Sequence, residues 1–437
     1  MAHEEPKIRI ETREELIYLL AEAAAIEHNL MCCYLFAAFG LKDEADGLSA
    51  AQAAQIEVWR RAIIGVAVEE MTHLALVANL TSSIGGSPHF SRPNFPVPRG
   101  YHPSGVIVEL HRFDRATLDH FIYLERPEGI DVPDGAGFVH GDESYVRDMG
   151  AGRLTPSAQD YATVGHLYRG IRKAIEALCG AQGEAAMFVG DPALQVGPDA
   201  ASLPGLIKVT DKASALLALD TIVEQGEGSP ADVAHSHYRR FIAIRDAYEK
   251  LQAENDGFEP SRPVAPNPVM RMPPSPEGKT FIDDAAAAPV LDLANALYGA
   301  MLRALVQGFA EREPARKRAF LDTAIDGMFA LSPVATHLTR LPASPRAPGL
   351  TAGITFAMLR DVSAPPDGET AARVLSERLR ELAEGAGRVL AGAPAGAETS
   401  ATLRRLADRL GALHQGAAGL RKGENAPAAN EQAPARS

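Results

Sequence analysis

Residues 66–80, VAVEEMTHLALVANL, have the composition of a buried helix but carry two polar side chains inside it. A helix turns by about 100° per residue, so positions i, i+3, i+4 and i+7 share one face. Glu70 and His73 therefore fall on the same apolar stripe as Val66 and Leu74. An unpaired carboxylate in a core is strongly destabilising, so this one requires a partner. The stretch predicts either a metal site or a hydrogen-bonded polar pair, and further ligands elsewhere must decide between them.

Hydrophobic periodicity predicts an all-α chain with two helical domains. The first domain contains long helices over 12–39, 50–83, 157–179 and 211–253, the last one interrupted by GEGSPADVA. A large insertion separates the second helix from the third, as in a four-helix bundle with a long crossover. Seven prolines between 260 and 276 favour an extended linker. The predicted organisation is a metal-binding bundle over 1–255, a linker over 256–280, a second helical bundle over 281–422 and a disordered tail over 423–437.

Charge and cysteine content exclude several classes of protein. The formal net charge of −13 disfavours binding to nucleic acid or to an anionic membrane. Three cysteines argue against a disulfide framework and for a reducing compartment. The charged N-terminal stretch does not resemble a signal peptide, and no run of about 18 consecutive apolar residues predicts a membrane span. A cytoplasmic protein is expected.

Candidate ligands recur on the first three helices of the first domain. Glu27 lies on an otherwise apolar face of the first helix, and Glu70 and His73 lie on the second. On the third helix His166 lies at the edge of the apolar face and is the only plausible ligand there. Tyr34, two turns after Glu27, is a candidate redox-active or hydrogen-bonding group, and the alternative is an ordinary core tyrosine.

The fourth helix offers Glu224 and Glu227 before its interruption and His237 after it. His237 shares a face with Phe241 and Ile244, so it is predicted to point inward. In four-helix metal bundles, two helices each give one Glu and two give a Glu-x-x-His pair, and together they hold two divalent ions. The same set could instead be polar core residues. Mixed carboxylate and imidazole ligation suits iron or manganese, with zinc as an alternative.

Several phrases resemble the ferritin-like domain of the iminophenyl-pyruvate dimer synthase family, whose members act in violacein and indolocarbazole biosynthesis. The phrases are AIEHNLMCCYLFA, EEMTHLALVANL followed by IGGSPHF, TVGHLYRGI, IVEQGEG and SHYRRF. The likeness continues through NALYGAMLRAL and TAGITF, so it covers most of residues 10–360.

The resemblance implies a ferritin-like bundle with an iron centre, most simply a di-iron one. At position 166 the family pattern implies a carboxylate where this chain has His. That departure bears on how many metals bind and with what geometry. By similarity, ligand roles fall on Glu27, Glu70, His73, Glu227 and His237, with Glu224 as a second candidate on the fourth helix.

Two functions are weighed. The first is a non-haem iron oxidase or oxygenase that uses dioxygen on a small organic molecule. The resemblance points to an amino-acid-derived metabolite, because the named enzymes couple two imines made from an aromatic amino acid. The second is a non-catalytic ferritin-like metal-binding protein, and a structural bundle without metal is a further alternative. The apolar helices of the second domain leave homodimerisation open.

Overall fold

The computed structural model describes residues 6–103, 105–140, 147–150, 154–226, 235–360, 362–392 and 397–419. Within these residues the regular secondary structure is helical apart from one parallel pair of two-residue strands and a few isolated bridges, which confirms the all-α prediction. The elements are α1 (Arg13–Phe39), a 3-10 turn η1 (Glu44–Asp46), α2 (Ala50–Ser83), α3 (Arg115–Leu124), α4 (Val164–Gln182), α5 (Glu184–Met187), a 3-10 turn η2 (Pro192–Leu194), α6 (Lys212–Gln225), α7 (His237–Glu254), β1 (Pro268–Val269), β2 (Thr280–Phe281), α8 (Ala287–Ala310), α9 (Pro314–Leu338), α10 (Gly368–Gly392) and α11 (Ala397–Gly419).

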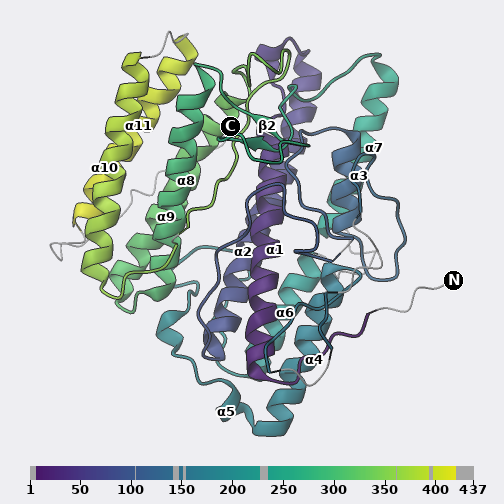
Figure 1. Cartoon of the computed structure of the whole chain (residues 1–437), viewed down its shortest axis with the longest axis vertical. Coiled ribbons are helices and arrows are strands. Elements are labelled where there is room, and N and C mark those ends of the chain that lie inside the picture. The colour runs from purple at the N-terminus through teal and green to yellow at the C-terminus, as the bar shows by residue number, and fades with distance from the viewer. Residues whose placement is uncertain are drawn as a thin grey trace.

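Two long antiparallel helices, α1 and α2, form the central pair of the molecule (Figure 1). Thr12 begins α1 with the predicted capping box, in which the side chain of Glu15 reciprocates. The start of α1 lies beside the end of α2, where the Arg13 guanidinium donates to the carbonyl oxygen of Ile84 at 2.7 Å. The pair therefore supplies two full-length walls for a bundle.

The other two walls are each built from two shorter helices: α3 and α4 form one wall, and α6 and α7 form the other. In Figure 1, α3 and α7 lie side by side in the upper half, and α4 and α6 lie side by side in the lower half. α4 packs against α1, whereas α6 and α7 both pack against α2. Each of these walls is thus interrupted near mid-height, which brings helix ends into the interior of the bundle.

The third predicted helix begins later in the structure than the sequence suggests. The expected start near residue 157 is wrong, because α4 begins at Val164. The Thr163 hydroxyl accepts the His166 backbone N–H at 3.1 Å and caps the helix there. The preceding residues are tied to the N-terminal segment instead, since Gln159 accepts a hydrogen bond from the Arg9 backbone.

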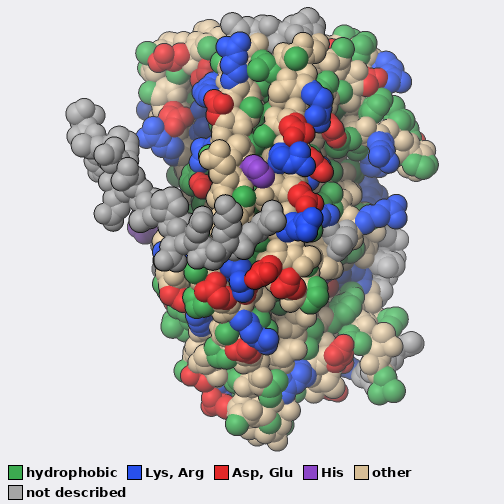
Figure 2. Space-filling view, turned by 90° about the vertical axis from the view of Figure 1, so that its left-hand side faces the viewer, with side chains coloured by type: hydrophobic (Ala, Val, Ile, Leu, Met, Phe, Trp, Pro, Cys, Tyr) green, Lys and Arg blue, Asp and Glu red, His purple; other side chains and the backbone are tan. Residues whose placement is uncertain are grey.

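The second bundle, α8 to α11, packs beside the first on the left of Figure 1. Buried polar contacts join the two: the His28 imidazole lies 2.5 Å from the Tyr298 hydroxyl, and Arg92 donates to the Phe356 carbonyl at 2.6 Å. The proline-rich segment lies against both bundles, because buried Arg262 reaches Asp46 on one side and Thr339 on the other. A domain boundary in that segment stays a prediction. The outer face of the second bundle carries interspersed acidic and basic side chains (Figure 2).

In the described part of the chain, three helices are long and apolar enough to cross a membrane by length and mean hydropathy, a property that consecutive apolar runs alone do not show. They are α1, α2 and α8, and between 67% and 83% of their most apolar 18-residue windows is buried inside the protein. Their apolar surface is therefore covered by the packing of the two bundles.

Stability is expected to fall in mild acid because of a buried histidine. Burial, with a contribution from the Arg147 charge, lowers the pKa of His102 to about 3. In the unfolded chain a histidine titrates near its model value of 6.5, so between pH 6.5 and 3 only the unfolded state binds this proton. The stabilisation is present above pH 6.5 and is lost as the pH falls, by up to about 1.4 kcal/mol per pH unit. Urea unfolding at several pH values should show a shallower acid slope for His102→Gln, and equal slopes would contradict this account.

Candidate metal centre

Five buried side chains from four helices converge in the interior of the first bundle. Each is at most 1% exposed. They form two groups of three in which the ligand-type atoms all lie within 4.8 Å of one another, and one residue belongs to both groups. The first group is Glu27, Glu70 and His73, and the second is Glu70, Glu125 and His237.

Glu70 stands between the two groups and offers one oxygen to each. Its Oε2 lies 3.0 Å from Nδ1 of His73, and its Oε1 lies 3.0 Å from Nδ1 of His237. Glu27 Oε2 lies 3.5 Å from Nδ1 of His73, and Glu125 Oε2 lies 3.4 Å from Nδ1 of His237. The arrangement is therefore nearly symmetric, with a central carboxylate and one terminal carboxylate and one imidazole on each side.

The interruptions of the two shorter walls explain how these side chains reach the interior. Glu125 is the C-cap residue of α3, and His237 is the first residue of α7, capped by Ser236. Both therefore project from helix ends, whereas Glu27 and Glu70 project from the middle of long helices. A continuous fourth helix would have needed a Glu-x-x-His pair, but position 234, three residues before His237, is Ala.

Each imidazole is oriented by a partner on its far nitrogen. Nε2 of His73 lies 3.2 Å from the side-chain oxygen of Gln225, at the end of α6. Nε2 of His237 lies 2.8 Å from Glu69, which also pairs with Arg240. These contacts leave Nδ1 of both rings directed at the carboxylates, as is usual for histidines that bind metal.

The two terminal carboxylates are each held by a tyrosine. The Tyr168 hydroxyl, on α4, donates to Oε1 of Glu27. The Tyr34 hydroxyl, on α1, donates to Oε1 of Glu125. In both carboxylates the other oxygen, Oε2, is the one that faces the imidazoles. The tyrosines therefore fix which oxygen of each carboxylate is presented to the centre.

The ionisable groups of the cluster perturb one another strongly. Burial, reinforced by the Glu70 charge, raises the pKa of Glu27 to about 8, and burial raises that of Glu125. Against the effect of burial, hydrogen bonds to Glu27 and Glu70 raise the pKa of His73 to about 10. The charges of Glu125 and Glu70 likewise outweigh burial and raise the pKa of His237, while the two imidazoles hold the pKa of Glu70 well below its usual range. Without a metal, protons on the imidazoles therefore balance the buried carboxylates.

The residues present fit divalent metal ions. Four buried atoms that face the centre lack a hydrogen bond of good geometry among the described residues, although each lies 3.0–3.5 Å from an opposing ring nitrogen or carboxylate oxygen: Oε2 of Glu27, Oε1 of Glu70, Oε2 of Glu125 and Nδ1 of His237. Buried polar atoms are rarely left in that state without a bound partner. A Cβ at Gly226 would lie 3.2 Å from the His73 ring and 3.6 Å from Nδ1 of His237, so a side chain there would crowd the space beside the two imidazoles. Three carboxylates and two imidazoles are the donors that iron and manganese prefer.

The structure places the residues predicted from the sequence as follows. Glu27, Glu70, His73 and His237 come together, and Tyr34 contacts the cluster through Glu125. Glu224 is exposed on α6 and lies outside both groups. His166 is buried in the first turn of α4, where its Nδ1 lies 3.3 Å from the Ala162 backbone nitrogen, and it also lies outside both groups. Glu227 falls outside the described residues. That any of these residues binds metal stays a prediction.

The sequence reasoning missed Glu125. It comes from the crossover between α2 and α4, whereas the four-helix pattern places the third carboxylate on the long helix that follows. A signal was present, because Glu125 follows Phe121 by four positions and Leu118 by seven and so continues the buried face of α3. Nothing in helical periodicity marks outer hydrogen-bond partners such as Tyr168, Glu69 and Gln225.

Removing the tyrosine that holds Glu125 is expected to destabilise the metal-free protein. Tyr34→Phe leaves that buried carboxyl without its hydroxyl donor, and hydrogen bonds to charged groups contribute about 1.5–3 kcal/mol. Urea unfolding should therefore show a loss of this order. The matched control is Tyr238→Phe on α7, a buried tyrosine whose hydroxyl makes no hydrogen bond among the described residues. Equal losses in the two variants would show that the Tyr34 hydroxyl does not stabilise the cluster.

Comparison with known proteins gives a family match that includes the whole cluster. A family model described as Ferritin-like matches residues 20–246. Dichlorochromopyrrolate synthase of Lentzea aerocolonigenes is 28% identical over 416 residues, which make up 86% of this chain and 39% of that protein. The 2-imino-3-(indol-3-yl)propanoate dimerase of Chromobacterium violaceum is 25% identical over 399 residues, with 86% and 37% covered. The chain thus spans about two fifths of the length of these relatives.

Among solved structures, a ferritin-like protein from Caulobacter vibrioides matches 79% of this chain and 100% of its own. Its sequence identity is 19% and its TM-score is 0.49.

Proposed function

The chain belongs to the ferritin-like family, and from that premise we propose that it is a metal-dependent oxidoreductase with a dinuclear non-haem iron centre. The observation that carries the proposal is the pair of buried three-residue groups that share Glu70. Glu70 offers one carboxylate oxygen to each group, so it would be a ligand shared by two ions. Glu27 with His73 would hold one ion, and Glu125 with His237 would hold the other.

The protein's own residues would serve binding, orientation and the exclusion of water. Gln225 and Glu69 fix the rings of the two histidines, and Tyr34 and Tyr168 fix the terminal carboxylates. Tyr34 also keeps a proton at Oε1 of Glu125, next to the centre. When bound, iron would supply redox chemistry with dioxygen.

An apolar lining on one side of the centre supports chemistry away from bulk water. The Tyr34 ring packs against Phe121 and Phe241, with ring centroids 4.7 Å and 5.1 Å away. All three side chains are buried. Excluding water strengthens electrostatic interactions in the site and protects reactive species from hydrolysis.

The substrate we propose is a small, amino-acid-derived metabolite. The support is the pair of relatives, one of which is named for an indole-bearing 2-imino acid. Manganese or zinc is the alternative metal, and a cytoplasmic location is part of the proposal because the three cysteines are free and buried. The competing function is metal binding without catalysis.

Oxygen consumption tests the proposal and separates the two functions. The full chain would be loaded anaerobically with ferrous iron and its metal content measured, with about two ions per chain expected. Dioxygen uptake would then be followed with a panel of 2-oxo acids and ammonia, which form 2-imino acids in solution. Substrate-dependent uptake by the native chain, absent from Glu70→Ala/His73→Ala, is the expected result. Full metal content without substrate-dependent uptake across the panel would favour the binding protein.

A further inference from the structure

A large cleft opens between the ends of α2 and α8, and residues of both helices line it. Its volume is about 920 Å³. Its wall combines basic side chains with apolar ones: His89, Arg312 and Arg360 are among the former, and Phe90, Val306 and Phe309 among the latter.

A smaller apolar chamber of about 70 Å³ lies deeper between the two bundles. Four methionines line it: Met31, Met71, Met301 and Met328. Its one ionisable lining residue is His28, whose nitrogens are both occupied, by the Phe90 carbonyl at 3.0 Å and the Tyr298 hydroxyl at 2.5 Å. Water would find no free polar partner there, so the chamber favours an apolar occupant.

The cleft and the chamber are successive sections along the same helices. On α2 the chamber is lined by Met71 and Leu74 and the cleft by Ser82, further along the helix. On α8 the order is the same, from Met301 in the chamber to Ala310 in the cleft.

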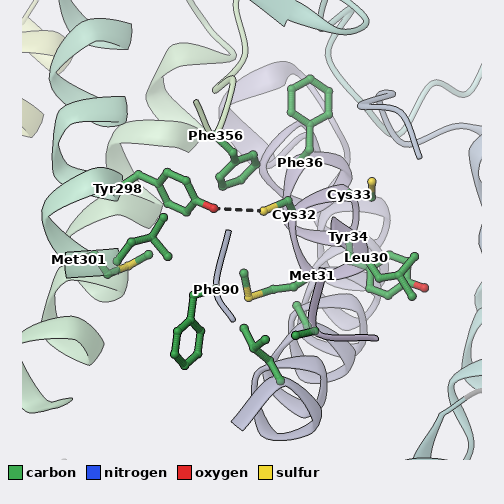
Figure 3. Packing of buried hydrophobic residues seen from close by; sticks show 14 of the residues in the cluster. Leu30, Met31, Cys32, Cys33, Tyr34, Phe36, Phe90, Tyr298, Met301 and Phe356 are labelled. Carbon is green, nitrogen blue, oxygen red and sulfur yellow. Dashed lines mark hydrogen bonds between the residues drawn. The ribbon is translucent and has the colours of Figure 1, made fainter. Parts of the chain in front are cut away.

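Two phenylalanines separate the cleft from the chamber. Phe90 and Phe309 line both, with ring centroids 5.0 Å apart and planes tilted by 54°. Figure 3 shows Phe90, Met31 and Met301 around one space between α1 and α8, and Tyr34 on the far side of α1. A ligand entering from the cleft would reach the chamber by passing this phenylalanine pair.

The cations of the cleft are available to a ligand. Arg360 is exposed and makes no ion pair among the described residues. Arg312 pairs with Asp191 at 3.0 Å, but both side chains are largely exposed and such pairs contribute little. In a chain with a net charge of −13, an unpaired cation beside an apolar chamber complements a carboxylate attached to an apolar group.

The size of the chamber limits that apolar group. One water requires about 10–15 Å³ by the same kind of measure, so the chamber has room for a group equivalent to about five waters. A flat ring fits this space, whereas a long acyl chain does not. Methionine side chains adapt to ring faces and make favourable sulfur–aromatic contacts.

We propose that the cleft and the chamber together form a binding site for a small aromatic carboxylic acid. The ring lies beyond Phe90 and Phe309 among the methionines, and the carboxylate pairs with Arg360. None of the five residues of the metal cluster lines the cleft or the chamber, so the site is distinct from the metal centre. Only the choice of probe rests on the proposed function.

Calorimetric titration of the metal-free full chain with indole-3-propionate tests the site. Indole-3-propionamide removes the charge of the probe and propionate removes its ring. We expect the indole acid to bind at least about tenfold more tightly than either, which corresponds to the contribution of one favourable charge or ring contact. Equal binding of acid and amide, no measurable binding of the acid, or tighter binding of dodecanoate would each overturn the proposal.

Variants locate the bound probe. Arg360→Gln should remove the preference for acid over amide, whereas Arg303→Gln, at an exposed arginine on α8 outside the cleft, should keep it. Ala201→Phe, which places a ring in the chamber, should weaken binding of the acid by about tenfold. If this variant does not fold, as judged by circular dichroism, the probe series and the arginine pair still decide. The titration uses neither metal nor dioxygen, so failed oxygen consumption leaves its result unaffected.

Discussion

The double variant Glu70→Ala/His73→Ala is expected to lose both metal ions while the chain remains folded. Glu70 is the only residue common to both ligand groups of the described structure, so its removal takes one ligand from each ion. His73 is the imidazole of the first group. Losing even an outer hydrogen-bond partner costs about 10–100-fold in metal affinity, so losing two ligands should reduce bound metal to a small fraction of the native content.

The fold should survive because the rest of the core does not depend on this pair. The central helices are held together by a long apolar interface, and the double change removes one buried carboxylate and one buried imidazole together. The expected observation is near-zero metal by elemental analysis with unchanged helical content by circular dichroism. Full metal content in the folded variant would show that the centre lies elsewhere, and the oxidoreductase proposal in its present form would fail with it.

Glu125→Gln is expected to lose about one metal ion per chain and to keep the other. Glu125 belongs only to the second group, where it faces His237, and Glu27 keeps the equivalent place in the first group. The amide is nearly isosteric and can still accept a hydrogen bond from the Tyr34 hydroxyl. It lacks the negative charge that a divalent ion requires, so the defect should be in binding rather than in folding.

The control for this variant is Glu224→Gln. Both changes remove one glutamate charge, but Glu224 is exposed on α6 and outside the cluster. Both variants would be prepared in parallel with the native chain. Elemental analysis should give about one ion per chain for Glu125→Gln and about two for Glu224→Gln. Loss of metal from Glu224→Gln with none from Glu125→Gln would favour Glu224, the second fourth-helix candidate of the sequence analysis, and would contradict the assignment of Glu125 as a ligand.

Four of the five residues of the centre could be predicted from the sequence because they lie within or at the start of regular helices. In the middle of a long helix the side-chain direction follows from spacing alone, and Glu27, Glu70 and His73 are all placed in this way. His237 was placed inward by the same reasoning, because α7 continues from it with a regular buried face through Phe241. Where the helical period is unbroken, the sequence therefore locates a ligand-type residue on the correct face.

The helical periodicity that fixes side-chain direction does not extend beyond the end of a helix. The chain direction changes at the end of α3 and at the end of α6, so spacing no longer says where the next side chain points. For that reason the sequence offers Glu224, one residue before Gln225 on α6, as a second candidate ligand on the fourth helix. In the structure Gln225 contacts His73 and Glu224 faces solvent.

By itself the sequence determined that the described part of the chain is all-helical, that its first part suits a four-helix bundle and that two long helices direct ligand-type side chains inward. Those conclusions follow from local periodicity and composition, which each helix expresses independently of the others. Only the tertiary structure decided that Glu125 stands opposite Glu27 across the shared Glu70, that Tyr34 and Tyr168 hold the outer carboxylates, and that an apolar chamber lies behind Phe90 and Phe309. These features join segments separated by up to about three hundred residues, and such contacts are set by how helices pack, not by the order of residues within any one of them.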